Sequence, residues 1–127
     1  MICKRFHYSW GIWMSDANTL HIKNYFAGTV SASVTDDNWN CCDSPKPGTV
    51  IGEIPQNGQA SLTFCRTDGH GCNGRQGQFQ ISIDSKDRID LNFDSHGDIG
   101  ITSVPTAFFA LLGQNSDNSY TLVVGPN

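Results

Sequence analysis

The residues best suited to chemistry are cysteines and histidines in and around a glycine-rich segment. His70 and Cys72 lie inside this segment, and Cys65 lies shortly before it. Cys41 and Cys42 come earlier in the chain. Thiolate sulfur and imidazole nitrogen are ligands that zinc prefers in a tetrahedral site. The spacing matches no regular zinc finger or ribbon, and the sequence has no Cys-x-x-Cys pair. We therefore predict neither a metal site nor a cofactor.

The pairing of the cysteines stays open at this stage. One alternative is a disulfide from Cys41 or Cys42 to Cys65 or Cys72, and the other is a set of buried free thiols. An odd count and the lack of a recognisable secretory signal weaken the case for a disulfide framework. Without a bridge, we expect Cys65 to face outward from its strand or to lie at its end. The five cysteines are Cys3, Cys41, Cys42, Cys65 and Cys72.

Catalysis is poorly supported by these residues. His70 and Cys72 could form a thiol–imidazole pair, but nucleophilic catalysis also needs a group that orients the base and donors for an oxyanion. The sequence has no G-x-S-x-G motif, no H-E-x-x-H motif and no phosphate loop. We predict that the protein is not an enzyme. Calcium is not predicted either, because four closely spaced aspartates lack the glycine and terminal glutamate of a calcium loop. These are Asp84, Asp87, Asp90 and Asp94.

The elements that must position the glycine-rich segment show the alternation of β-strands. Apolar residues alternate with polar ones at 62–64, before the segment, and again at 79–83 and 89–93, after it. A period of two places one face of each strand in a core and the other in water. The intervening 67–77 is predicted to form a shaped loop because its glycines allow unusual backbone angles. Residues 84–87 are predicted to connect a hairpin.

The rest of the chain continues this pattern. Asn57-Gly58 is a hairpin signal, and the proline-containing 36–48 reads as a loop. A continuous apolar run at 107–112 is either a buried strand or a helical turn, which periodicity cannot decide. We predict an all-β fold, a single-domain antiparallel β-sandwich of about eight or nine short strands over residues 1–127. The other expected strands are 10–14, 19–25, 30–34, 49–54, 60–66, 99–104 and 120–124.

The charge and the apolar content of the sequence limit the classes of partner that we expect. The chain has 127 residues, 16% of them charged, and a net charge of −4, so a nucleic-acid backbone is not an expected partner. No apolar run approaches the roughly 20 residues that span a bilayer. Residues 1–14 are too polar and too short for a secretory signal core. We expect cytoplasmic synthesis without a signal peptide, followed by release and association with membranes.

Aromatic residues gather early in the chain, near strand ends and loops. Tryptophan and tyrosine have an apolar body and a polar tip, which suits the boundary between water and lipid. The core is the favoured place for Trp10 and Phe26, whereas the polar loop around Trp39 favours contact with lipid. Phe108-Phe109 is predicted to lie in the core.

Five short stretches resemble the aegerolysin family. The glycine-segment match is the most specific, and the resemblance runs from about residue 10 to 124. The chain departs from the family at 93–97, where FDSHG lacks an aromatic residue and a proline, and it lacks the glycine that follows the cysteine of the CRTD stretch. The matching stretches are LHIKN (20–24), GTVI (48–51), CRTD (65–68), GRQGQF (74–79) and LNFD (91–94).

The resemblance implies a small acidic β-sandwich that binds membrane lipids, typically sphingolipid-type headgroups in bilayers that can contain sterol. It also implies the recognition component of a two-component pore-forming cytolysin or toxin, with a perforin-like protein partner. A carbohydrate-binding lectin is the alternative function. A structural or inhibitor protein that uses a sheet edge is a third. The predicted lipid-binding residues are Trp10, Tyr25, Trp39, Arg66, Asp68, Asn73 and Arg75.

Overall fold

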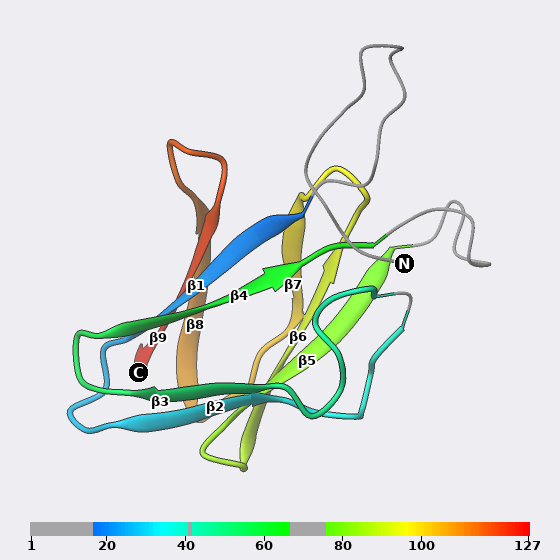
Figure 1. Cartoon of the computed structure of the whole chain (residues 1–127). Coiled ribbons are helices and arrows are strands. Elements are labelled where there is room, and N and C mark those ends of the chain that lie inside the picture. Colours follow the sequence, from blue (N-terminus) through cyan, green and yellow to red (C-terminus); the bar gives the residue numbers. More distant parts are fainter. Residues whose placement is uncertain (1–16, 41, 67–75) are drawn as a thin grey trace, which may run out of the picture.

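The computed structural model describes residues 17–40, 42–66 and 76–127, which form a β-sandwich of two sheets (Figure 1). The predicted all-β sandwich is thereby confirmed, whereas the expected strand 10–14 and nearly all of the glycine-rich loop lie outside the described residues. The four-stranded sheet has the order β4 (Gln59–Phe64), β1 (Asn18–Asn24), β9 (Tyr120–Pro126) and β8 (Phe108–Gln114). The five-stranded sheet has the order β3 (Val50–Ile54), β2 (Val30–Val34), β5 (Gly77–Ile83), β6 (Asp87–Phe93) and β7 (Ile99–Ser103).

One pair of strands departs from the predicted antiparallel arrangement. β1 and β9 run parallel, in a register from Leu20 opposite Tyr120 to Asn24 opposite Val124. Parallel neighbours cannot be joined by a short hairpin and need a long connection. Here almost the whole described chain lies between the two strands, so local turn signals could not reveal their pairing.

The Asn57-Gly58 signal marks a turn but not a hairpin within one sheet. β3 pairs with β2, and β4 pairs with β1, so the turn carries the chain from one sheet to the other. Asn57 has a φ of 62°, and the Gly58 amide donates to the Pro55 carbonyl over 2.8 Å. The dipeptide thus supplies the expected backbone conformation. The apolar pattern of the flanking strands does not specify which sheet each strand joins.

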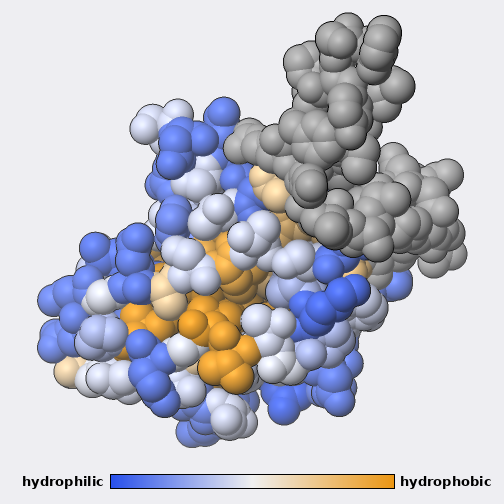
Figure 2. Space-filling model, in the orientation of Figure 1, coloured by the Kyte–Doolittle hydropathy of each residue, from blue (hydrophilic) through white to orange (hydrophobic). Residues whose placement is uncertain are grey.

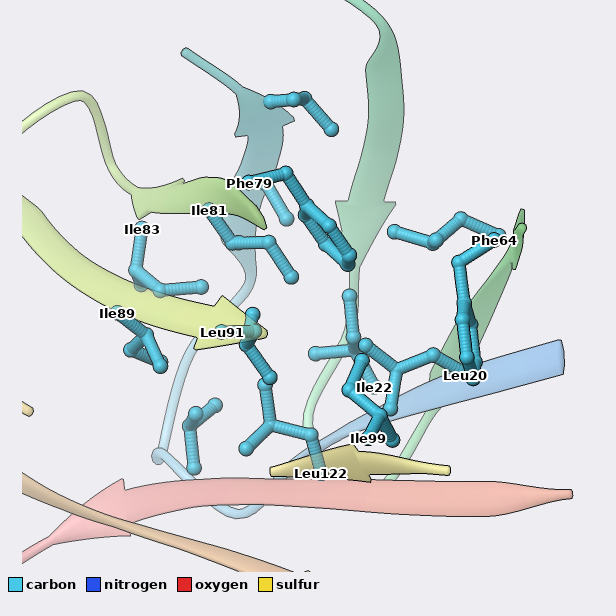
Figure 3. Close-up of a cluster of buried hydrophobic side chains, with 14 of the residues drawn as sticks. Leu20, Ile22, Phe64, Phe79, Ile81, Ile83, Ile89, Leu91, Ile99 and Leu122 are labelled. Carbon is cyan, nitrogen blue, oxygen red and sulfur yellow. The ribbon is translucent and has the colours of Figure 1, made fainter. Parts of the chain in front are cut away.

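The core lies between the sheets and follows the predicted alternation (Figure 3). The rings of Phe64 and Phe93 pack edge-to-face with centroids 5.1 Å apart, and Phe79 joins Phe93 at 5.8 Å. Gly77 is required beside them, because a Cβ there would lie 2.6 Å from Cζ of Phe93. These rings come from β4, β5 and β6, so they hold the two sheets together.

No helix occurs among residues 17–40, 42–66 and 76–127, and accordingly none there is long and apolar enough to cross a bilayer. The ambiguous run at 107–112 is resolved as a strand, β8. Among the strands that the structure describes, β8 is an edge strand that pairs with β9 alone.

Candidate functional site

Three of the predicted lipid-binding residues lie in the described part of the chain, in different environments. Tyr25 is 46% exposed, whereas Arg66 is buried at 3% exposure. Trp39 is half-buried against the core, and its Nε1 donates to the Pro45 carbonyl over 2.9 Å. The Lys46 Nζ lies 5.7 Å from the centroid of that indole. The remaining four lie outside the described residues, namely Trp10, Asp68, Asn73 and Arg75.

The two described cysteines are not joined to each other. Cys65 is disulfide-bonded and fully buried, so it does not face outward, although it does lie just beyond the end of β4. Cys42 is a free, buried thiol whose Sγ lies 3.1 Å from the Gln78 carbonyl oxygen. Burial raises the pKa of this thiol to about 12, which keeps it protonated and unreactive at neutral pH.

Tyr25 is positioned by the buried side chain of Asn24, which ends the IKN stretch. The Asn24 Nδ2 donates to the carbonyls of Gly28 and Ile54, both over 2.8 Å. Its Oδ1 accepts from the Phe26 amide over 2.7 Å. A fully buried amide with these bonds fixes the turn that follows β1. The Tyr25 amide then donates to the Val124 carbonyl over 2.8 Å, which holds Tyr25 beside β9.

Apolar side chains gather around Tyr25 on the outer face of the four-stranded sheet. In the register, Leu111 of β8 lies opposite Val123 of β9, which lies opposite Lys23 of β1. Phe109 lies opposite Gly125 in the adjacent row. Leu111 is 64% exposed in the middle of its strand. The apolar face is defined as Lys23, Tyr25, Phe109, Leu111 and Val123.

The ring of Phe109 packs directly against a glycine of β9, Gly125. A Cβ at Gly125 would lie 2.7 Å from Cε1 of Phe109 and 3.1 Å from Cβ of Tyr25. Only glycine leaves room for the ring to cross β9 at this point. The two aromatic residues therefore flank the same glycine and form a continuous surface with Leu111 and Val123.

The four strands of this sheet carry no negatively charged side chain. β4, β1, β9 and β8 contain no aspartate or glutamate, although the chain as a whole has 12 acidic residues and a net charge of −4. Lys23 is the only lysine or arginine in these four strands. Its Nζ lies 5.5 Å from the centroid of the Tyr25 ring, so a cation–π contact places the ammonium group at the apolar face.

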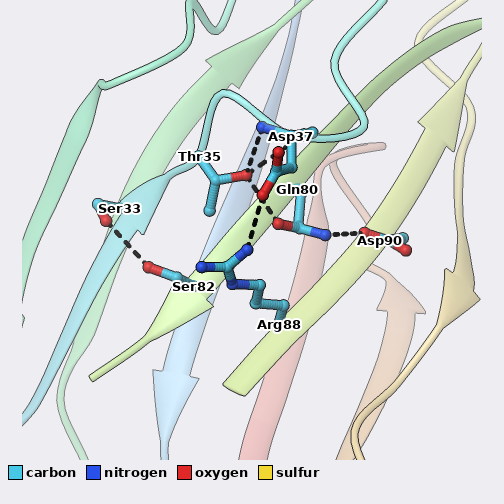
Figure 4. A network of polar contacts seen from close by, with 7 residues as sticks. All are labelled: Ser33, Thr35, Asp37, Gln80, Ser82, Arg88 and Asp90. Atoms are coloured by element: carbon cyan, nitrogen blue, oxygen red, sulfur yellow. Dashed lines mark hydrogen bonds and ion pairs between the residues drawn. The ribbon is translucent and has the colours of Figure 1, made fainter. Parts of the chain in front are cut away.

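The outer face of the five-stranded sheet has the opposite character (Figure 4). Gln80 accepts from Thr35 Oγ1 over 2.8 Å, and its Nε2 donates to Asp90 over 2.7 Å. Arg88 forms an ion pair with Asp37, also at 2.7 Å. The polar face is defined as Ser33, Thr35, Asp37, Gln80, Ser82, Arg88 and Asp90.

A second apolar area lies where the two sheets meet at β3 and β4. Figure 2 shows hydrophobic residues reaching the surface between these strands, with hydrophilic residues around them. Val50 is 77% exposed there, beside a β-bulge at which Gly52 has a φ of 131°. The residues of these two strands that are not buried include no aromatic residue, and β3 carries Glu53.

Sequence reasoning missed Phe109, Leu111 and Val123. It placed Phe109 in the core, whereas the structure places it half-buried on the outer face. The signal was the continuous apolar run at 107–112. An antiparallel sheet with one wet face reads as alternation, so an unbroken apolar run indicates that both faces of the strand are apolar.

Two comparisons of the sequence with known proteins found no match. A scan of the chain against models of protein families matched none of them, and a search among curated proteins found no matching protein. The resemblance to aegerolysins therefore stays a prediction from the residues alone.

Proposed function

We propose that this protein binds membrane surfaces through its apolar face. The observation that carries this proposal is an exposed leucine and tyrosine on a sheet whose strands hold no carboxylate. Leu111 and Tyr25 are 64% and 46% exposed, and Lys23 lies beside them. Aliphatic, tyrosine and lysine side chains are the combination that inserts at, and anchors to, a lipid–water interface.

The charge distribution favours lipid over a protein partner on this face. Phosphate-bearing headgroups repel carboxylates and attract ammonium groups. Lys23 can extend its ammonium group toward phosphate while its methylene stem stays on the apolar surface. The acidic residues of the chain's other strands, Glu53, Asp87 and Asp90, all belong to the five-stranded sheet.

The finer part of the proposal rests on the resemblance to aegerolysins. It assigns a preference for sphingolipid-type headgroups and a role as the recognition component of a two-component cytolysin, with a perforin-like partner. Trp39 and Arg66 have no place in the binding surface we propose, because the first is tied to Pro45 and the second is buried.

Vesicle sedimentation tests the proposal with two matched variants. Leu111→Asp places a charge on the apolar face, and Val50→Asp does the same on a more exposed aliphatic residue of the other sheet. Burial of a leucine side chain contributes about 1.5–3 kcal/mol, so Leu111→Asp should weaken binding to phosphatidylcholine–sphingomyelin–cholesterol vesicles roughly ten- to hundredfold. Val50→Asp should bind as the unmodified protein does.

Three results would contradict the proposal. The first is no binding of the unmodified protein to any vesicle. The second is a loss confined to Val50→Asp, which would move the site to the area between β3 and β4. The third is a change of oligomeric state in Leu111→Asp without vesicle binding, which would make the face a contact between copies of this chain. Circular dichroism and thermal melting serve as the folding controls.

Carbohydrate binding is the second candidate, favoured by the polar face. Gln80 and Ser82 are nearly buried there and are pre-organised by hydrogen bonds, as in many sugar sites. The same bonds, however, satisfy these side chains internally. A glycan array tests it: specific binding that Gln80→Ala abolishes would support this function instead.

A further inference from the structure

The β1–β2 turn and the β5–β6 hairpin lie at the same end of the sandwich (Figure 1). Residues of both turns line a pocket there. Its volume is about 340 Å³, which lies in the range of small-ligand sites. Val30 and Ile83, both buried, form its inner part, and Ala27, Gly28, Thr29 and Ala107 complete the apolar and neutral lining.

Two aromatic rings line this pocket. Phe26 and Phe108 pack edge-to-face, with centroids 5.3 Å apart and planes at 78°. Phe26 is fixed by its amide, which donates to Oδ1 of the buried Asn24 over 2.7 Å. Aromatic faces carry the negative end of the ring quadrupole and attract a cation within about 6 Å.

Two carboxylates line the same pocket, and the described residues of its lining include no basic residue. Asp84 occupies a tight turn with a φ of 55°, and its Oδ1 accepts from the Ser31 amide over 2.8 Å. Asp87 shares the face of β6 that carries the buried Ile89 and Leu91, so its side chain is directed between the sheets. Negative charge is therefore placed next to aromatic and aliphatic walls.

We propose that this pocket binds an organic ammonium group, with a methylated ammonium preferred. A calcium ion takes about six to eight oxygen ligands, whereas the side chains of the described lining offer two carboxylates and the Thr29 hydroxyl beside apolar walls. A methylated ammonium carries its positive charge on an apolar surface, so it can contact rings and carboxylates at once without hydrogen bonds. Recognition of such groups by aromatic cages is a recurring use of the cation–π interaction.

The pocket stands beside the apolar face. Phe26 follows Tyr25, and Phe109 follows Phe108, so in each pair one ring belongs to the pocket and the other to the apolar face. A choline-type lipid headgroup and a free choline-like molecule present the same ammonium chemistry to this site. The inference does not need the membrane surface, because free ligand alone could fill the pocket.

Titration of the ¹⁵N-labelled protein followed by NMR tests the pocket. Tetramethylammonium and choline should shift the amides of Gly28, Val30 and Phe108. The neutral choline analogue 3,3-dimethylbutan-1-ol, which has the same shape without charge, should bind at least tenfold more weakly. Methylammonium should also bind more weakly than tetramethylammonium.

Substitutions in the pocket test whether its carboxylate and its ring determine the affinity for tetramethylammonium. Asp87→Asn keeps the side-chain shape and should lower the affinity for tetramethylammonium at least fivefold, and Phe26→Leu should lower it further. Asp36→Asn, an equal change of charge on an exposed loop residue, is the matched control and should bind normally. The inference would be overturned if the neutral analogue bound as tightly as choline. It would also be overturned if calcium ions, but not choline, displaced bound tetramethylammonium.

Vesicles distinguish the source of the ammonium group and separate this inference from the membrane proposal. If a headgroup is the ligand, choline should compete with phosphatidylcholine vesicles, and Asp87→Asn should weaken vesicle binding. If only free ligand enters, tetramethylammonium should bind while vesicle binding is insensitive to choline. Vesicle binding without any ammonium binding would remove the pocket inference and leave the apolar face standing.

Discussion

The outer faces of the two sheets are built by the same period-two alternation, yet they carry different chemistry. On the five-stranded sheet, Gln80 joins Thr35 and Asp90 in a chain of hydrogen bonds. On the four-stranded sheet, Leu111 and Val123 lie where polar residues are the rule, and Phe109 covers Gly125. The polar face is satisfied internally, whereas the apolar face leaves hydrophobic surface in water. Exposed apolar surface of this kind is typical of sites that contact a membrane or another protein.

The largest expected effect is the loss of stability at high pH, and it should arise on the side of the five-stranded sheet. Cys42 contacts the Gln78 carbonyl of β5, and burial raises the pKa of its thiol from 9.0 to about 12. Between these two pH values the folded protein holds a proton that the unfolded chain releases. The contribution of the buried thiol to stability is therefore fully present below pH 9 and is lost progressively as the pH rises to about 12. The free energy of unfolding should fall by about 1.4 kcal/mol per pH unit in this window.

Urea unfolding at several pH values measures this slope. Cys42→Ser is the control, because its hydroxyl can still donate to the same carbonyl but does not titrate in this range. Equal slopes in the two proteins would show that Cys42 is not the group responsible.

The next largest effect concerns the glycine under Phe109. Gly125→Ala should cost about 1–3 kcal/mol of stability, because the added Cβ would displace the ring of Phe109. It should also weaken vesicle binding, since the displaced ring changes the shape of the apolar face. Gly113→Ala on β8 has nothing within 4 Å of its Cβ and should change neither property. Thermal melting measures the stability and vesicle sedimentation measures the binding. Similar behaviour of the two variants would show that Gly125 has no special role beneath Phe109.

A change on the polar face should affect stability alone. Gln80→Ala removes the bonds to Thr35 and Asp90 and should cost about 1–2 kcal/mol. Its affinity for vesicles, measured where the protein is still folded, should equal that of the unmodified protein. A matching loss of vesicle affinity would place the polar face in the binding surface.

Reversing one charge on each face should have an effect no larger than that of Gln80→Ala. Lys23→Glu should weaken binding to phosphatidylglycerol-containing vesicles by about 1–2 kcal/mol, or roughly tenfold. Arg88→Glu makes the same change of charge on the polar face, where Arg88 pairs with Asp37 at the surface. That variant should lose at most about twofold, because salt screens charges far from the bilayer. Equal losses in the two variants would indicate a net-charge effect without a defined binding face.

The sequence predicts the interior of this protein well because burial imposes a strict period. Phe79, Ile81 and Ile83 face the core as their alternation requires, and Asp84 and Ser85 form the expected hairpin turn with positive φ. The partition of strands between sheets could not be read in the same way. Asn57-Gly58 fits a turn within a sheet or between sheets equally well, and the parallel pairing of β1 with β9 has no local signal.

The candidate site was only partly predictable. Tyr25 was predicted from its amphipathic ring, and it is exposed. Trp39 lies in a polar loop, but its indole packs against the core and donates a hydrogen bond to the Pro45 carbonyl. Flanking polarity does not show where an indole packs. The apolar face depends on registers between Leu111, Val123 and Lys23 that bring β8, β9 and β1 together. Such registers arise from tertiary pairing, which one sequence does not display.

The most direct test of the central claim is paramagnetic broadening in NMR spectra of the unmodified protein bound to phosphatidylcholine–sphingomyelin bicelles that carry a nitroxide on a lipid headgroup. The nitroxide broadens amide signals close to the lipid surface. Binding through the apolar face predicts the strongest broadening at Tyr25, Leu111 and Val123, and the weakest at Ser33, Gln80 and Asp90. Strongest broadening on the polar face, or around Val50 and Ile51, would contradict it.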